Sequence, residues 1–180
     1  MRQITISAGQ SNNSAIAHHF GSKQALLEAV CDLRLEELEA AHKRRLEEAE
    51  AAGNLGVREL LGAILLPLSE DVGEEGDPIF ARFLSRLVYL SPEEHPMYRD
   101  ERRLATARRI DRQLQELLPF LPKGLFYVRY RLVIGMYLAG IVERSRILEA
   151  AKGFGGEARS ITDDLLTIAT AALSAPLTEE

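Results

Sequence analysis

The sequence contains one cysteine, no tryptophan and no long hydrophobic run. Cys31 cannot form a disulfide within the chain, so nothing points to an oxidising compartment, and we expect a buried, unreactive thiol. The longest apolar run, residues 132–142, has eleven residues, whereas a membrane-spanning helix needs roughly 20. The first residues also lack the continuous apolar segment of a secretory signal. These absences predict a soluble, cytoplasmic protein.

An excess of positive charge is also absent, because 22 Lys and Arg stand against 27 Asp and Glu, a net charge of −5. Phosphate neutralisation by basic side chains supplies most non-specific affinity for nucleic acid, so this balance argues against it. The charge is unevenly distributed, however. Residues 1–27 contain Arg2 and Lys23 and no acid. A small basic head on an acidic body is compatible with DNA binding at one end.

Strand patterns are nearly absent, whereas apolar residues recur at spacings of three and four, which predicts an all-α protein. Gly and Pro divide the chain into helical segments. We expect a helix-turn-helix head over residues 1–30, followed by a larger helical-bundle domain over residues 31–180. The expected helices span 2–8, 12–20, 23–52, 57–72, 78–90, 97–118, 123–151 and 158–174.

The head shows a helix-turn-helix pattern. Gly9 suits a tight turn after a short apolar-faced helix, Ser11 can cap the next one, and Ile16 and Phe20 lie on its inward side. The outward side is polar or small and carries no acid: Asn12, Asn13, Ser14, Ala17 and His18. Asn can bond bidentately to adenine, and Ala can contact a thymine methyl. Ser22 can cap the third helix, where Lys23 and free N–H groups could hold a phosphate.

The string from Ala8 to Leu27, AGQSNNSAIAHHFGSKQALL, resembles the recognition-helix signature of tetracycline-repressor (TetR) family regulators. One subgroup reads approximately Ala-Gly-Gln-Arg-Asn-Asn-Ser-Ala-Val-x-Tyr-His-Phe-Gly-Ser-Lys. The resemblance implies a DNA-binding repressor that a small-molecule effector releases from a palindromic operator. It implies DNA contacts at Ser11, Asn12, Asn13, Ser14, Ala17, His18, His19 and Lys23. His18 departs from the signature, which usually has a phosphate-contacting Tyr there.

The family also places an amphipathic helix before the segment that corresponds to residues 2–8, and this sequence begins with Met1-Arg2. Either the true start of the protein lies upstream of Met1, or the first helix is missing, and short helices without a packing partner are marginal. This leaves an alternative hypothesis, a dimeric small-molecule-binding helical module that lacks effective DNA binding.

The segment 123–151 is apolar on more than one side, which predicts burial against its own subunit and against a second one. The final helix offers small and apolar residues at similar spacing. We expect a four-helix dimer interface, as the resemblance also implies, and the alternative is packing within one subunit. The interface would use Leu125, Val128, Leu132, Gly135, Ala139, Val142, Leu165, Ile168, Ala169 and Ala172.

In the family, the central helices enclose the effector pocket. The residues that could line it here are Arg82, Phe83, Arg86, Leu87, Tyr89, Tyr130 and Tyr137, and the alternative for each is an ordinary core or surface role. No catalytic constellation or cofactor motif emerges, so we expect no enzyme and no cofactor. His18 and His19 are adjacent, point about 100° apart on a helix, and lack a partner cluster, so no metal site is expected.

Overall fold

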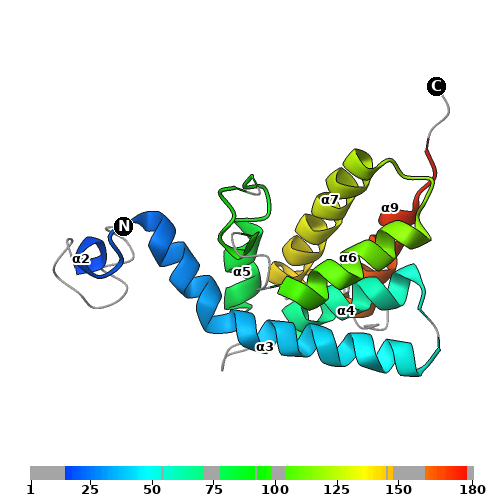
Figure 1. The fold of residues 1–180 in the computed structure, drawn as a ribbon, viewed down its shortest axis with the longest axis horizontal. Helices are drawn as coiled ribbons and strands as arrows, with labels where there is room; N and C mark the ends of the chain where they lie inside the picture. Colours follow the sequence, from blue (N-terminus) through cyan, green and yellow to red (C-terminus); the bar gives the residue numbers. More distant parts are fainter. Residues whose placement is uncertain are drawn as a thin grey trace.

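The computed structural model describes residues 15–53, 55–70, 78–91, 93–98, 104–144, 146–147 and 161–177. Within these ranges the chain forms helices and no strand, which confirms the predicted all-α class (Figure 1). The predicted helix over residues 2–8 lies outside the described residues. The division at residue 30 stays a prediction, because one continuous helix crosses that position.

Helix α2 (Ala15–Phe20) and helix α3 (Lys23–Ala51) are joined by a tight turn. Gly21 has φ of 69°, a backbone conformation that residues with a side chain rarely adopt. Ser22 is extended, and its Oγ accepts a hydrogen bond from the Ala25 N–H at 3.0 Å, which confirms the predicted cap. Figure 1 shows α2 at one end of α3, away from the other helices.

The long helix α3 buries one side against the body. Its buried residues repeat every three or four positions, as one face of a helix requires: Cys31, Leu35, Leu38, His42 and Leu46. Cys31 is 1% exposed, in agreement with the expected buried thiol. Glu39 faces α6, where its Oε1 accepts a hydrogen bond from the Thr106 N–H at 2.6 Å. On the exposed side of α3, the Nζ of Lys43 lies 3.9 Å from the Oε1 of Glu47.

Helix α4 (Val57–Glu70) is the central element, packed against α3, α6 and α9. Most of its residues are buried, including Pro67, which the sequence already placed inside a helix and which removes one backbone donor. Two cross-helix contacts fix its position at the surface. Arg58 bonds to Asp163 and to the Thr167 Oγ1 on α9, and Arg45 on α3 pairs with Glu70.

Helix α5 (Ile79–Ser85) is shorter than the predicted segment 78–90. Past Ser85 the chain tightens into turns, in which the Leu87 N–H bonds to the Leu84 carbonyl and the Leu90 N–H to the Leu87 carbonyl. These three-residue closures end the α-helix. A 3₁₀ turn, η1 (Pro96–Tyr98), and helix α6 (Ala105–Leu117) replace the predicted single helix over 97–118.

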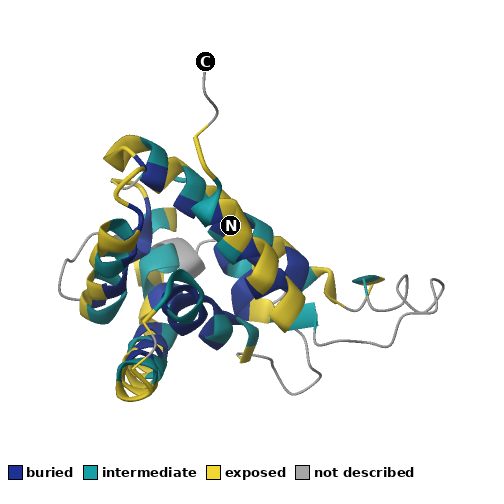
Figure 2. Ribbon diagram, turned by 90° about the vertical axis from the view of Figure 1, so that its right-hand side faces the viewer, coloured by how far each residue is buried: buried dark blue, intermediate teal, exposed yellow. Residues whose placement is uncertain are grey.

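Helix α7 (Lys123–Val142) and helix α9 (Ile161–Ser174) pack side by side, and α7 also contacts α5. Helix α7 ends at Val142. Residues 144, 146 and 147 are again helical, and residues 148–151 of the predicted segment lie outside the described residues. By length and composition α7 could cross a membrane, but a buried core helix meets the same criteria. Figure 2 shows buried residues on the inward sides of the helices and exposed residues on their outer sides.

Candidate functional site

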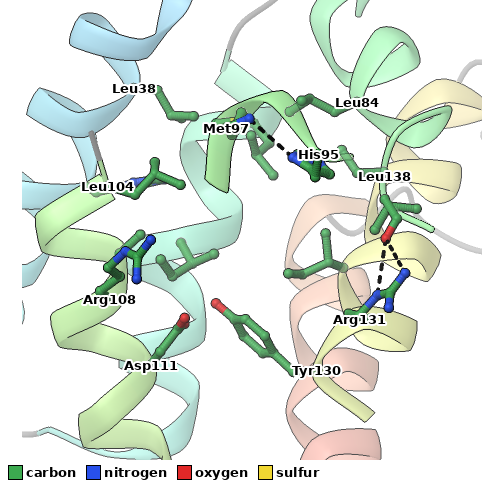
Figure 3. A pocket seen from close by; sticks show the side chains of 16 residues that line it. Leu38, Leu84, His95, Met97, Leu104, Arg108, Asp111, Tyr130, Arg131 and Leu138 are labelled. Carbon is green, nitrogen blue, oxygen red and sulfur yellow. Dashed lines mark hydrogen bonds between the residues drawn. The ribbon is translucent and has the colours of Figure 1, made fainter. Parts of the chain in front are cut away.

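A cavity of about 120 Å³ lies inside the bundle, between α3, α4, α6, α7 and the segment from α5 to η1 (Figure 3). Most of its wall is apolar, and the aliphatic residues come from every one of these elements: Leu38, Ile64, Leu68, Leu84, Val88, Met97, Leu104, Ala107, Ile134 and Leu138. A few polar side chains complete the lining: His42, His95, Arg108, Asp111, Tyr130 and Arg131. Apolar walls with few polar groups are typical of small-molecule sites.

Asp111 and Tyr130 face each other across the cavity from α6 and α7 (Figure 3). The Asp111 Oδ1 has almost no contact with solvent and no hydrogen-bond partner. Burial raises the pKa of this carboxyl to about 6, although a hydrogen bond from Tyr130 and the charge of Arg108 both lower it. The carboxylate oxygen is therefore a buried acceptor that is still available to a donor.

Arg131 ties α7 to the segment that follows α5. Its Nε and Nη2 both donate to the Val88 carbonyl at 3.3 Å, and its Nη2 also donates to the Leu90 carbonyl at 3.1 Å. These carbonyls lie in the turns beyond the end of α5, so the guanidinium fixes a part of the chain that has no regular helix. The cavity wall at Val88 depends on this contact.

His95 is buried beside Arg131, just before η1. Its Nδ1 accepts a hydrogen bond from the Met97 N–H at 3.3 Å. Burial, together with the positive charge of Arg131, lowers the pKa of His95 to about 4. The ring is neutral at neutral pH and serves as a structural acceptor in this wall.

His42 is a second buried histidine, on the inward side of α3 and 4% exposed. By geometry neither ring nitrogen has a hydrogen-bond partner, and Oε2 of Glu39 lies 4.0 Å from its Nδ1. Burial lowers the pKa of His42, against the opposing influence of Glu39 and of the Ile64 backbone. The cavity thus touches α3 through Leu38 and His42.

A second hollow of about 580 Å³, here named the outer hollow, adjoins the cavity. It shares four residues with the cavity: Arg108, Asp111, Tyr130 and Arg131. Its other lining residues are Arg112, Gln115 and Tyr127, of which Arg112 and Tyr127 are exposed. The polar side chains therefore stand between the apolar cavity and the surface.

Of the residues predicted to bind an effector, Tyr130 lines the cavity. Tyr137 and Leu87 are buried, and Phe83 is partly buried against the core, but none of the three is part of the lining. Tyr89 is 64% exposed, and Arg82 and Arg86 also point outward. The structure therefore does not bring the predicted set together.

Sequence reasoning missed His42, His95 and Asp111. Two of them carried a signal, because His42 continues the buried stripe of Leu35 and Leu38 on α3, and Asp111 lies a turn after Ala107 on the inward side of α6. A polar residue inside an apolar stripe has to be hydrogen-bonded, or it marks a site. His95 lies in a connection without periodicity, and no pattern could have indicated it.

The predicted DNA-contacting residues are placed in part. Ser11, Asn12, Asn13 and Ser14 lie outside the described residues, and the structure describes only the backbone of Ala17. His18, His19 and Lys23 are exposed around the α2–α3 turn, and the two histidine rings contact edge to face at 5.7 Å between centroids. Phe20, predicted to face inward, is 38% exposed.

The predicted dimer residues fall into two sets. Val128, Leu132 and Ile168 are more than half exposed, and Ala139 and Ala172 are also exposed. These five form what we name the α7–α9 face. In contrast, Gly135, Leu165 and Ala169 are buried within the subunit, and Leu125 and Val142 pack partly against its core. A Cβ at Gly135 would lie 2.5 Å from the Tyr89 hydroxyl, so this glycine makes room for a side chain of its own chain.

The fold and cavity define an all-helical bundle that encloses a small, largely apolar chamber beneath a long helix, which carries a short helix at its end. Residues 63–172 match the family model described as tetracyclin repressor-like, C-terminal domain. The match covers more than half of the chain, and the protein belongs to this family. Membership points to a regulator and not to an enzyme. No curated protein and no solved structure matches the chain.

Proposed function

We propose that this protein is a cytoplasmic, nucleoid-associated DNA-binding transcriptional regulator, a repressor that a small-molecule effector releases from its operator. The observation that carries the proposal is the position of the cavity. Its wall includes Leu38 and His42 of α3, and the same helix begins directly after α2. A ligand in the cavity therefore contacts the helix that supports the proposed reading head. Family membership over residues 63–172 supports the same interpretation.

A second link connects the cavity wall to the start of α3. The Nε2 of Gln24, in the first turn of α3, donates a hydrogen bond to the Glu94 carbonyl at 3.1 Å. The residue after Glu94 is His95, which lines the cavity. Movement of this wall would change a contact one residue away from Lys23. Two states of the wall would then give two orientations of α2, as a ligand-controlled switch requires.

DNA binding is proposed for the α2–α3 turn because its exposed side chains include no acid. His18, His19 and Lys23 are exposed, and Gly21 and Ser22 add no bulk. The N-terminus of α3 also presents free backbone N–H groups that favour an anion. In a dimer, two such heads would read half-sites about 34 Å apart. An effector that separates the heads would break this spacing.

The test uses the full chain and DNA fragments from upstream of its own gene, with binding followed by fluorescence anisotropy at several salt concentrations. We expect sequence-selective binding that weakens with salt. The Lys23→Ala substitution should lower the salt slope by about 1, because one phosphate contact is lost. The control is Lys43→Ala, an exposed lysine farther along α3. Equal binding to scrambled DNA would contradict the proposal.

A further inference from the structure

We propose that the cavity takes an uncharged, mainly aliphatic molecule with one hydrogen-bond donor, of which a simple alcohol is the model, and that the donor binds the Asp111 carboxylate. This inference rests on the proposed function in that it names the effector class of the same cavity. Its test requires no DNA, so either conclusion can fail without the other.

The cavity offers a ligand one buried acceptor atom. The Asp111 Oδ1 is enclosed and has no hydrogen-bond partner, and Figure 3 shows the carboxyl turned toward Tyr130 across the cavity. The hydrogen bond from Tyr130 to the carboxyl leaves this oxygen unpaired, so Oδ1 has lost its water without a replacement. A ligand hydroxyl placed there restores the missing bond, whereas an ether oxygen in the same place cannot, because it has no proton to donate.

The surrounding charges exclude ionic ligands. An ammonium group at Asp111 would also meet the positive charge of Arg108, which already acts on this carboxyl. Arg131 does not offer its donors to an anion either. Arg131 directs its donors to the Val88 and Leu90 carbonyls, and a ligand carboxylate would lie against the ionised Asp111. A neutral donor avoids both repulsions.

The apolar part of the cavity lining determines what the rest of the ligand can be. Away from the four residues shared with the outer hollow, the lining consists of aliphatic side chains, Met97 and the two neutral histidines. An aliphatic body removes apolar surface from water both on the ligand and on this wall. A flexible, short hydrocarbon chain with a terminal hydroxyl therefore matches the chamber and its polar end.

The experiment compares four six-carbon probes by NMR titration of the full-length protein at about pH 8, where Asp111 is ionised. The probes are 1-hexanol, its isomer pentyl methyl ether, hexylammonium and hexanoate. Amide shifts at Met97, Ile134 and Leu138 report binding in the cavity, because all three line it. We expect 1-hexanol to bind about tenfold more tightly than the ether, as one hydrogen bond to a charged group predicts.

Three variants complete the test. Asp111→Leu should remove the preference of the alcohol over the ether, and Asp111→Asn, which keeps an oxygen acceptor, should retain part of it. The matched control is Glu116→Gln, an exposed acid on α6 outside both linings, which should leave the ratio unchanged. Equal affinity for alcohol and ether in the wild type, tighter binding of either ionic probe, or no shift with any probe would overturn the proposal.

Discussion

The buried ionisable groups of the cavity act in opposite directions on stability. Asp111 has a raised pKa of about 6, so the folded protein binds its proton more tightly than the unfolded chain does. Its contribution is fully present below the unfolded pKa and is lost as pH rises through 6. His95 has a lowered pKa of about 4. Its contribution is present above the unfolded pKa and is lost as pH falls through 4. Over the window between them, the two effects largely cancel.

Replacing one of these two groups should reveal the effect of the other on the pH dependence of stability. In the Asp111→Asn variant, acidification from about pH 7 to about pH 4.5 should cost about 2 kcal/mol more than in the wild type, because each pKa unit is worth about 1.4 kcal/mol and most of the raised pKa takes effect in this range. Urea unfolding at a series of pH values measures this difference. His95→Gln should show the opposite change, a gain relative to the wild type in acid. Parallel pH profiles for all three proteins would contradict the assignment.

Individual residues could be predicted from the sequence where local chemistry decides their role. The cap at Ser22 follows from its position before a helix, and the structure confirms it. The cavity residues could not be assigned in this way, because a lining residue and a core residue have the same spacing. Tyr89 and Tyr130 illustrate the difference: both are tyrosines of the central region, yet the former is 64% exposed and the latter 6%.

At the scale of the helices, close approach between α7 and α9 depends on Gly140. A Cβ at this position would overlap the Leu165 side chain, and Leu165 is itself buried. The close approach therefore belongs to the interior of one subunit. Sequence spacing assigned Leu165 to an interface between subunits, because periodicity shows which side of a helix is apolar but not which neighbour covers it.

The Gly140→Ala substitution should destabilise the fold by about 1–2 kcal/mol, because the added methyl overpacks a closed contact by more than the gain in helix propensity. Thermal unfolding checks this. Gly124→Ala is the matched control on the same helix, since a Cβ there meets no atom within 4 Å. The control should leave stability unchanged or raise it slightly. An equal response of the two variants would refute the packing argument.

Helix boundaries were predictable where Gly, Pro or a cap marks them and were wrong where tertiary contacts decide them. The start of α3 and that of α7 agree with the sequence. The end of α5 does not, since Arg131 from another helix satisfies the carbonyls of Val88 and Leu90 and thereby supports turns in place of a further helical turn.

At the scale of the whole molecule, the α7–α9 face is a group of exposed apolar side chains on two adjacent helices. Val128 and Leu132 lie one turn apart on α7, and Ile168 is on α9. Exposed apolar side chains on two packed helices favour an interaction site. We expect a second copy of the chain to cover it, which gives the two reading heads that a palindromic operator requires.

Placing a charge on this face should separate the subunits. Leu132→Glu should weaken self-association by about 30-fold or more, because a central interface residue contributes about 2 kcal/mol or more. Light scattering after size exclusion reports the mass across a dilution series. The control, Leu33→Glu, changes a leucine that is 78% exposed on α3, outside this face, and should not alter the mass. A wild type that is monomeric at every concentration would disprove the dimer.

The four residues shared by the cavity and the outer hollow form a polar entrance to the apolar cavity. A ligand that enters from the outer hollow would pass these residues with its hydrocarbon chain first, and its polar group would stay beside them. The association rate would then depend on the desolvation of the entering hydrocarbon chain. The residence time would depend on how readily water replaces the hydrogen bond at Asp111.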